Sequence, residues 1–414
     1  MRQLLRAAVL AAALASASPV LAQSRTDTLT LDEAIGRAVA ASPQGAAFTA
    51  RLDTLNAARS AADTRPAASV DVLAENFGIG GDDLNRQIQI TGTYNRLIER
   101  GGKRAARVGL ADADIEVARA EALVRRLDIA TTVQRAYVEV QAAAALIGVT
   151  RERVSIAEQL SREVGRRVDA ARDPLFAGTR ARTQVAEARV DLELAEHALD
   201  AAMRRLSALW GGTPGGLSVE IEDFLRVREP PAGLAPAPVD LAIFEARRRR
   251  AEASLRLQQT NRRLDPTVSA GPRLIGTGDI AVVAGVSLPL RNRALNRANI
   301  ARAEAEARQV DAELAVEVFQ RRQQLALAAE RVGETALEVE AIRDNVVPGA
   351  LRTLAEVRAG YNRGGFTFLD VSTAQTALHE ARARMVRAAT RHHEARVELD
   401  RLTGRFAPLV QEDR

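Results

Sequence analysis

Residues 185–209 read VAEARVDLELAEHALDAAMRRLSAL, and residues 378–402 read LHEARARMVRAATRHHEARVELDRL. In both stretches small or apolar residues recur at alternating spacings of three and four, which is the heptad pattern of helices packed along their sides. The matching positions are Val185, Ala188, Leu192, Ala195, Leu199, Ala202, Leu206 and Leu209, and then Leu378, Ala381, Met385, Ala388, His392, Ala395, Leu399 and Leu402. The sequence therefore predicts two long packed helices that share one plan, 193 residues apart.

The repetition extends well beyond this seam. The same shift maps Gly211 onto Gly404, so that each seam helix ends at a glycine. We therefore divide the chain into a first repeat at 29–211 and a second repeat at 241–404. The segment between them, 212–240, is rich in glycine and proline and is predicted to be an extended linker.

Each repeat is predicted to contain a helix, a β-hairpin and two long helices. Thr30 and Glu33 form a capping-box signature that opens the first helix, which we expect to end before Pro66. The predicted hairpins and long helices are 68–98, 102–167 and 174–210 in the first repeat, and 267–290, 296–360 and 368–403 in the second, followed by a C-terminal tail at 405–414. At 1.5 Å per residue, the helix at 102–167 would be roughly 100 Å long.

Alternation with period two predicts the strands. Ile88, Ile90, Gly92 and Tyr94 alternate with polar neighbours, and residues 280–288 alternate in the same way. Four strands cannot close a barrel, because the smallest membrane barrels have about eight. The predicted fold class is thus mainly α with a small β part: two tandem repeats of long coiled-coil helices, with four strands contributed to a barrel shared between copies.

One heptad stripe in the second repeat meets a proline. Val318, Leu325, Val332, Val339 and Val346 recur every seven residues, and Pro348 follows directly after the last of them. We expect this proline to interrupt an otherwise continuous helix.

Composition narrows the function classes. Residues 1–22 have the layout of a secretory signal peptide, and the chain contains no cysteine, which excludes thiolate metal sites and cysteine nucleophiles. The net charge of +5 comes from scattered arginines, with Lys103 the only lysine, so we expect no nucleic-acid partner.

The sequence contains no phosphate loop and no nucleophile elbow, so we predict neither an enzyme nor a cofactor. The four histidines, His197, His379, His392 and His393, form no metal-ligand spacing, and we expect no metal site.

Several ordered motifs on this duplicated frame resemble the TolC-like outer-membrane efflux proteins. They are Leu29–Ile35 followed by Ser42-Pro43, then Gly101-Gly102-Lys103-Arg104, Leu288-Pro289-Leu290, and Tyr361-x-x-Gly364 before Phe368-Leu369-Asp370-Val371. The glycine-glycine-lysine-arginine stretch is similar to the heavy-metal cation (CzcC-like) branch of that family.

The resemblance implies an efflux transmembrane transporter in the outer membrane with a large periplasmic portion. It implies a homotrimer in contact with outer-membrane lipid, with a twelve-stranded barrel and a helical tunnel. The tunnel would dock onto a periplasmic adaptor (membrane fusion) protein and an inner-membrane pump of the resistance-nodulation-division class. It also implies heavy-metal cations as cargo.

The resemblance places the gate at the periplasmic tip. It implies that Asp370 lines the pore and that Tyr361 tethers neighbouring helices, although Asp370 also suits a helix cap. Three symmetry-related carboxylates around one lumen would attract cations. Thr373 stands where a second acidic residue can occur and Phe366 where the basic partner of the tyrosine can occur, so we expect packing to matter more than polar links at this gate.

Two other functions remain open at this stage. A channel of the same build could export drugs or polypeptides, as in type I secretion. A periplasmic coiled-coil adaptor would also be exported and have long helical hairpins, but two similar β-hairpins on a duplicated frame do not favour it.

Overall fold

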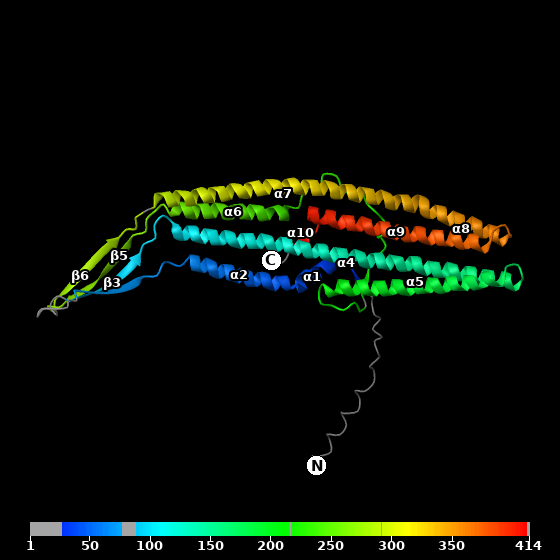
Figure 1. Cartoon of the computed structure of the whole chain (residues 1–414), viewed down its shortest axis with the longest axis horizontal. Coiled ribbons are helices and arrows are strands. Elements are labelled where there is room, and N and C mark those ends of the chain that lie inside the picture. The colour runs from blue at the N-terminus through cyan, green and yellow to red at the C-terminus, as the bar shows by residue number, and fades with distance from the viewer. Residues whose placement is uncertain (1–26, 77–87, 216, 291, 412–414) are drawn as a thin grey trace, which may run out of the picture.

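The computed structural model describes residues 27–76, 88–215, 217–290 and 292–411. Long helices lie side by side in an elongated, gently curved bundle, and a small sheet extends from one end of it (Figure 1). The predicted signal peptide at 1–22 lies outside the described residues, as does part of the predicted hairpin at 68–98. The mainly α fold class with four long strands is confirmed.

In its described residues, the first repeat contains four helices and two long strands. They are α1 (Leu31–Ala41), α2 (Pro43–Ala62), β2 (Ser69–Glu75), β3 (Gln89–Leu97), α4 (Lys103–Asp169) and α5 (Leu175–Ala208). The capping box is present, since Thr30 Oγ1 accepts from the Glu33 amide at 3.3 Å and Glu33 accepts from the Thr30 amide at 3.1 Å. The single opening helix was a wrong prediction: Pro43 has no N–H to continue α1 and instead starts α2, which Ser42 caps.

The second repeat follows the same order with one irregularity. Its elements are α6 (Pro238–Thr260), β5 (Thr267–Ile275), β6 (Ile280–Ser287), α7 (Arg293–Ala341), a π-helical turn (Ile342–Val346), α8 (Val347–Asn362) and α9 (Phe368–Thr403), with α10 (Ala407–Gln411) after it. Pro348 does not break the rod; the turn before it widens, because proline removes one donor and crowds the carbonyl four residues earlier. The widening shifts the stripe by one residue, so Val346 is 41% exposed and Val347 packs instead.

The linker is less extended than predicted. Its strand β4 (Leu217–Val219) pairs in parallel with β1 (Asp27–Leu29), so the start of the first repeat and the linker are hydrogen-bonded to each other. Phe224 is buried against α9, where its ring stacks on His393 with centroids 4.9 Å apart. A buried aromatic ring anchors the linker to the bundle at this point.

The four long strands form one antiparallel sheet in the order β2-β3-β5-β6. Each repeat contributes one hairpin, and β3 pairs with β5 across the repeat boundary. One face is apolar and exposed, and it carries Val70, Val72, Ile90, Tyr94, Val268, Leu274, Ile280, Val282 and Val286. The opposite face is mainly polar on β2, β3 and β5, where Asn95 donates to Asp71 at 2.7 Å and Arg273 donates to Thr91 at 2.9 Å.

The core runs along the rods. Every position of the two predicted seams is buried or half-buried, and alanine fills many of them, which lets the helices approach closely. No helix in the described part of the chain is long and apolar enough to cross a bilayer.

Candidate functional site

The end of the bundle farthest from the sheet holds two helix turns side by side (Figure 1). One turn joins α4 to α5 and the other joins α8 to α9. Apolar residues of both hairpins form one shared core there: Leu160, Val164, Ala177, Ala181, Leu354, Tyr361, Phe368, Val371, Ala374 and Leu378. The first and second repeats therefore meet at this tip.

Both turns have the same backbone. In the first, the Ala171 amide donates to the Val168 carbonyl at 2.9 Å, and in the second the Gly364 amide donates to the Tyr361 carbonyl at 3.0 Å. Ala171 and Gly364 both have positive φ, +54° and +84°. Because the two turns have equivalent backbones, each position of the first turn can be compared with the position 193 residues later in the second.

Tyr361 joins the two turns through polar contacts. It is 1% exposed, and its hydroxyl donates a short hydrogen bond to the Asp173 carboxylate. Arg167 completes the group: its Nε donates to Asp173 at 3.0 Å, and its guanidinium carbon lies 4.3 Å from the centre of the tyrosine ring. We call Arg167, Asp173 and Tyr361 the tip lock.

Burial and neighbouring charges act in opposite directions on the pKa of Asp173 in the tip lock. Burial on its own would raise the pKa of Asp173, but hydrogen bonds from Arg167 and Tyr361 and the arginine charge outweigh it, so the pKa lies below its ordinary value. Burial and the bond to Asp173 raise the pKa of Tyr361 well above its usual value. The tyrosine thus stays a neutral donor to an ionised carboxylate across the physiological pH range.

Asp370 lies at the start of α9 beside this lock. It is the N3 residue of a capping box: its amide donates to Thr367 Oγ1, and its carboxylate accepts from the Thr367 amide at 2.8 Å. Hydrogen bonds from the Thr367 hydroxyl and amide lower its pKa, so this exposed side chain remains charged. Thr367, and not Asp370, is the N-cap residue.

Sequence reasoning missed the polar partners of Tyr361. Phe366 lies over Gly360, where an added Cβ would be 2.2 Å from the ring, and so it packs within its own turn. The basic and acidic partners come from the other repeat, so polar links accompany the apolar packing at the tip. A signal was present, because positions 167 and 173 are the repeat equivalents of 360 and 366.

The Gly101-Gly102-Lys103-Arg104 motif forms the corner between β3 and α4. Both glycines have positive φ, and a Cβ on Gly101 would be 2.5 Å from Arg263 Cγ. Lys103 pairs with Asp265 at the start of β5, and its Nζ donates to the Arg263 carbonyl at 2.8 Å. The motif therefore joins the corners of the two repeats.

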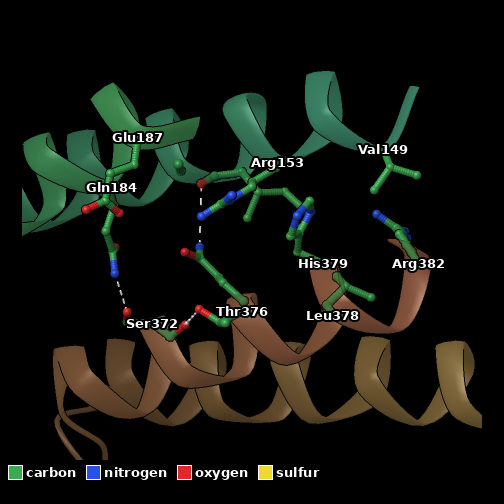
Figure 2. A pocket seen from close by; sticks show the side chains of 12 residues that line it. Val149, Arg153, Gln184, Glu187, Ser372, Thr376, Leu378, His379 and Arg382 are labelled. Carbon is green, nitrogen blue, oxygen red and sulfur yellow. Dashed lines mark hydrogen bonds between the residues drawn. The ribbon is translucent and has the colours of Figure 1, made fainter. Parts of the chain in front are cut away.

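A small polar cavity of about 80 Å³ lies between α4, α5 and α9, farther from the tip. Figure 2 shows Arg153, Gln184, Ser372, His379 and Arg382 around it. Gln184 contacts Ser372 across the cavity, and His379 Nδ1 is buried with no hydrogen-bond partner among the described residues. The cavity is large enough for ordered water.

His392 and His393 serve packing. His392 is 1% exposed, and burial, His393 and Arg396 lower its pKa to about 4. His393 Nε2 lies 2.8 Å from the Phe224 carbonyl. Within the described ranges, no cluster of three or more metal-ligating side chains occurs.

Comparisons with known proteins identify relatives in sequence and in fold. No protein-family profile matches it. It is 26% identical over 395 residues to the cobalt-zinc-cadmium resistance protein CzcC of Cupriavidus metallidurans, covering 94% of this chain and 93% of that protein. Its fold matches the outer membrane protein VceC of Vibrio cholerae with a TM-score of 0.70 and 19% identity, over 90% of this chain and 96% of VceC. It also matches the outer-membrane channel OprN with a TM-score of 0.67 and 16% identity, over 90% and 89% of the two chains.

The chain has the fold of these outer-membrane proteins, and it is similar to CzcC over nearly its full length. VceC is an outer membrane protein and OprN an outer-membrane channel, and the long helices and the four-stranded sheet of this chain share their fold.

Proposed function

We propose that three copies of this chain form the outer-membrane conduit of a tripartite efflux system. The four-stranded sheet carries this proposal, because its two edges and its apolar exposed face need partners that one chain lacks. Three sheets make a twelve-stranded barrel, and three bundles continue it as a periplasmic tunnel. A periplasmic adaptor protein and an inner-membrane pump of the resistance-nodulation-division class deliver the cargo.

The proposed cargo is a heavy-metal cation such as cobalt, zinc, cadmium, copper or silver. The similarity to a cobalt-zinc-cadmium resistance protein over nearly the full length of both chains supports this choice. The conduit itself needs no metal site, since the pump selects the cargo and the channel passes it.

The gate proposal assigns roles to the tip. The tip lock holds the hairpin of the first repeat to the hairpin of the second and keeps the tunnel closed. Three copies of Asp370, each ionised and exposed, form a negative ring at the entrance that favours cations.

Deletion of the gene, followed by growth on metal salts, drugs and a secreted-polypeptide reporter, tests the cargo. We expect increased sensitivity to divalent metal salts that plasmid-borne wild-type protein reverses. Sensitivity confined to organic drugs, or loss of polypeptide secretion alone, would instead identify the alternative cargo.

Asp370→Arg tests the ring. We expect reconstituted channels to shift from cation to anion preference in planar bilayers, because the ring changes sign. Glu33→Arg is the matched control, since Glu33 occupies the same capping-box position at the start of α1, and its substitution should leave ion selectivity unchanged. Unaltered selectivity in Asp370→Arg channels would remove Asp370 from the pore.

A further inference from the structure

Arginines gather where the sheet joins the helices. Arg65 precedes β2, Arg96 and Arg100 lie at the end of β3, and Arg293 starts α7 after β6. All four are exposed, and within the described part of the chain none lies within ion-pair distance of a carboxylate. We call these four residues the arginine collar.

The acidic residues of this corner are already paired. Glu99 binds Arg107, and Asp63 binds Arg104 at 2.8 Å. Asp265 binds Lys103 and also accepts from the Arg100 backbone amide at 2.9 Å, so it leaves the Arg100 side chain free. The collar is therefore an uncompensated positive surface.

The exposed side chains along β3 indicate the depth in the membrane at which the arginine collar lies. Ile90, Tyr94 and Arg96 lie in that order on the apolar face of β3 and are exposed, and Ile98, also exposed, follows after the strand ends at Leu97. An apolar row that changes to tyrosine and then to arginine has the order found where a bilayer core gives way to headgroups. Arg96 thus lies at headgroup level on the face turned toward lipid.

The opposite end of the sheet has the opposite charge. Among the described residues at 74–76, 88–90 and 275–280, the charged side chains are Glu75 and Asp279. Arg273 lies nearer the middle of β5, but its side chain points to the polar face and contacts Thr91 and Gln89. Among the described residues, the positive surface therefore lies at the helix-proximal end of the sheet, the periplasmic side in the proposed orientation.

We propose that the arginine collar binds anionic phospholipid headgroups of the periplasmic leaflet of the outer membrane. This inference rests on the proposed barrel and adds a lipid preference to it. Guanidinium groups bind phosphate through paired donors, and each basic residue near an anionic surface contributes about a fivefold gain in binding. Bound lipid would fix the height of the barrel in the membrane.

Lipid titration of the detergent-solubilised full chain, followed by native mass spectrometry, tests the collar. Phosphatidylglycerol, phosphatidylcholine and inorganic phosphate are the three probes. We expect tighter binding of phosphatidylglycerol than of phosphatidylcholine, and about 25-fold weaker phosphatidylglycerol binding in Arg96→Gln/Arg100→Gln. The matched control is Arg180→Gln/Arg352→Gln, which removes two exposed arginines without ion pairs near the other end of the rods and should bind lipid as wild type does.

Three outcomes would overturn the inference. They are equal affinity of the wild type for the two lipids, an equal loss in the control variant, and full displacement of phosphatidylglycerol by inorganic phosphate. Liposome flotation separates this failure from failure of the proposed function. A chain that floats with neutral and anionic liposomes alike refutes only the collar, whereas a chain that floats with neither refutes the membrane barrel.

Discussion

Tyr361→Phe is the sharpest perturbation of the proposed gate. It removes one oxygen atom and leaves the ring stacked under the Arg167 guanidinium. Asp173 keeps its two contacts from Arg167, at 3.0 and 3.2 Å, but loses the tyrosine donor. The change therefore removes the side-chain bond from Tyr361 to the first hairpin with little effect on packing, while the Arg167 guanidinium still donates to the Tyr361 carbonyl at 3.1 Å.

The size of the effect follows from the charge of the acceptor. A hydrogen bond to an ionised group contributes about 2 kcal/mol, and little solvent reaches the 1% exposed tyrosine to replace it. If the bond exists only in the closed state, its loss favours opening by about 30-fold in each subunit. Three subunits that open together would multiply this to about 10⁴-fold.

Single-channel recording in planar bilayers measures this shift as open probability. Tyr137→Phe is the matched control, because Tyr137 is also buried and donates a 2.8 Å bond to the Leu29 carbonyl, but it lies in the core around α1. We expect Tyr361→Phe to raise open probability and Tyr137→Phe to leave it unchanged. A folded Tyr361→Phe trimer that stays as closed as the wild type would refute the lock.

Three further substitutions test contacts in other parts of the fold. Lys103→Met should lower the stability of the purified protein by up to about 3 kcal/mol in thermal unfolding, because Asp265 is left largely buried without its cation. His392→Leu should flatten the pH dependence of stability. In the wild type the unfolded histidine takes up a proton near pH 6.5 and the folded one only near pH 4, so stability falls by at most about 3 kcal/mol as pH drops through that window; a wild-type unfolding midpoint that stays constant between pH 7 and 4 would contradict this. Gly271→Ala should abolish assembly in heat-modifiability gels, since its Cβ would lie 1.8 Å from the Gly92 carbonyl, whereas Gly92→Ala meets no atom within 4 Å and should assemble.

Periodic features could be predicted from the sequence. The seams at 185–209 and 378–402 are buried because a heptad pattern specifies one helix face, and the hairpins follow from alternation. Each of these signals is local and repeated, so errors at single positions do not alter the result.

Irregular features could not be predicted in the same way. A π-helical turn ahead of Pro348 keeps the rod continuous, whereas Pro43 begins a new helix, so one residue type gave two outcomes. Neighbouring packing decides between them: the π-helical turn and the adjoining ends of α7 and α8 pack against α9, whereas no residue of α2 is buried. Local sequence does not contain that difference.

The tip lock was hidden for a different reason, which the duplication explains. Positions 167 and 173 of the first turn correspond to Gly360 and Phe366 of the second, and Ala171, at φ +54°, occupies the place of Gly364. The backbone is retained even though an alanine there costs about 1 kcal/mol, so the turn geometry has been kept while its chemistry changed. In the first turn, the Arg167–Asp173 ion pair still has donors and acceptors for a neighbouring side chain. In the second turn, the Phe366 ring over Gly360 has none. Only the first turn can therefore bind the hydroxyl of the tyrosine in the second turn, and the signal for this pairing lies in how the two equivalent turns differ and not in either turn alone.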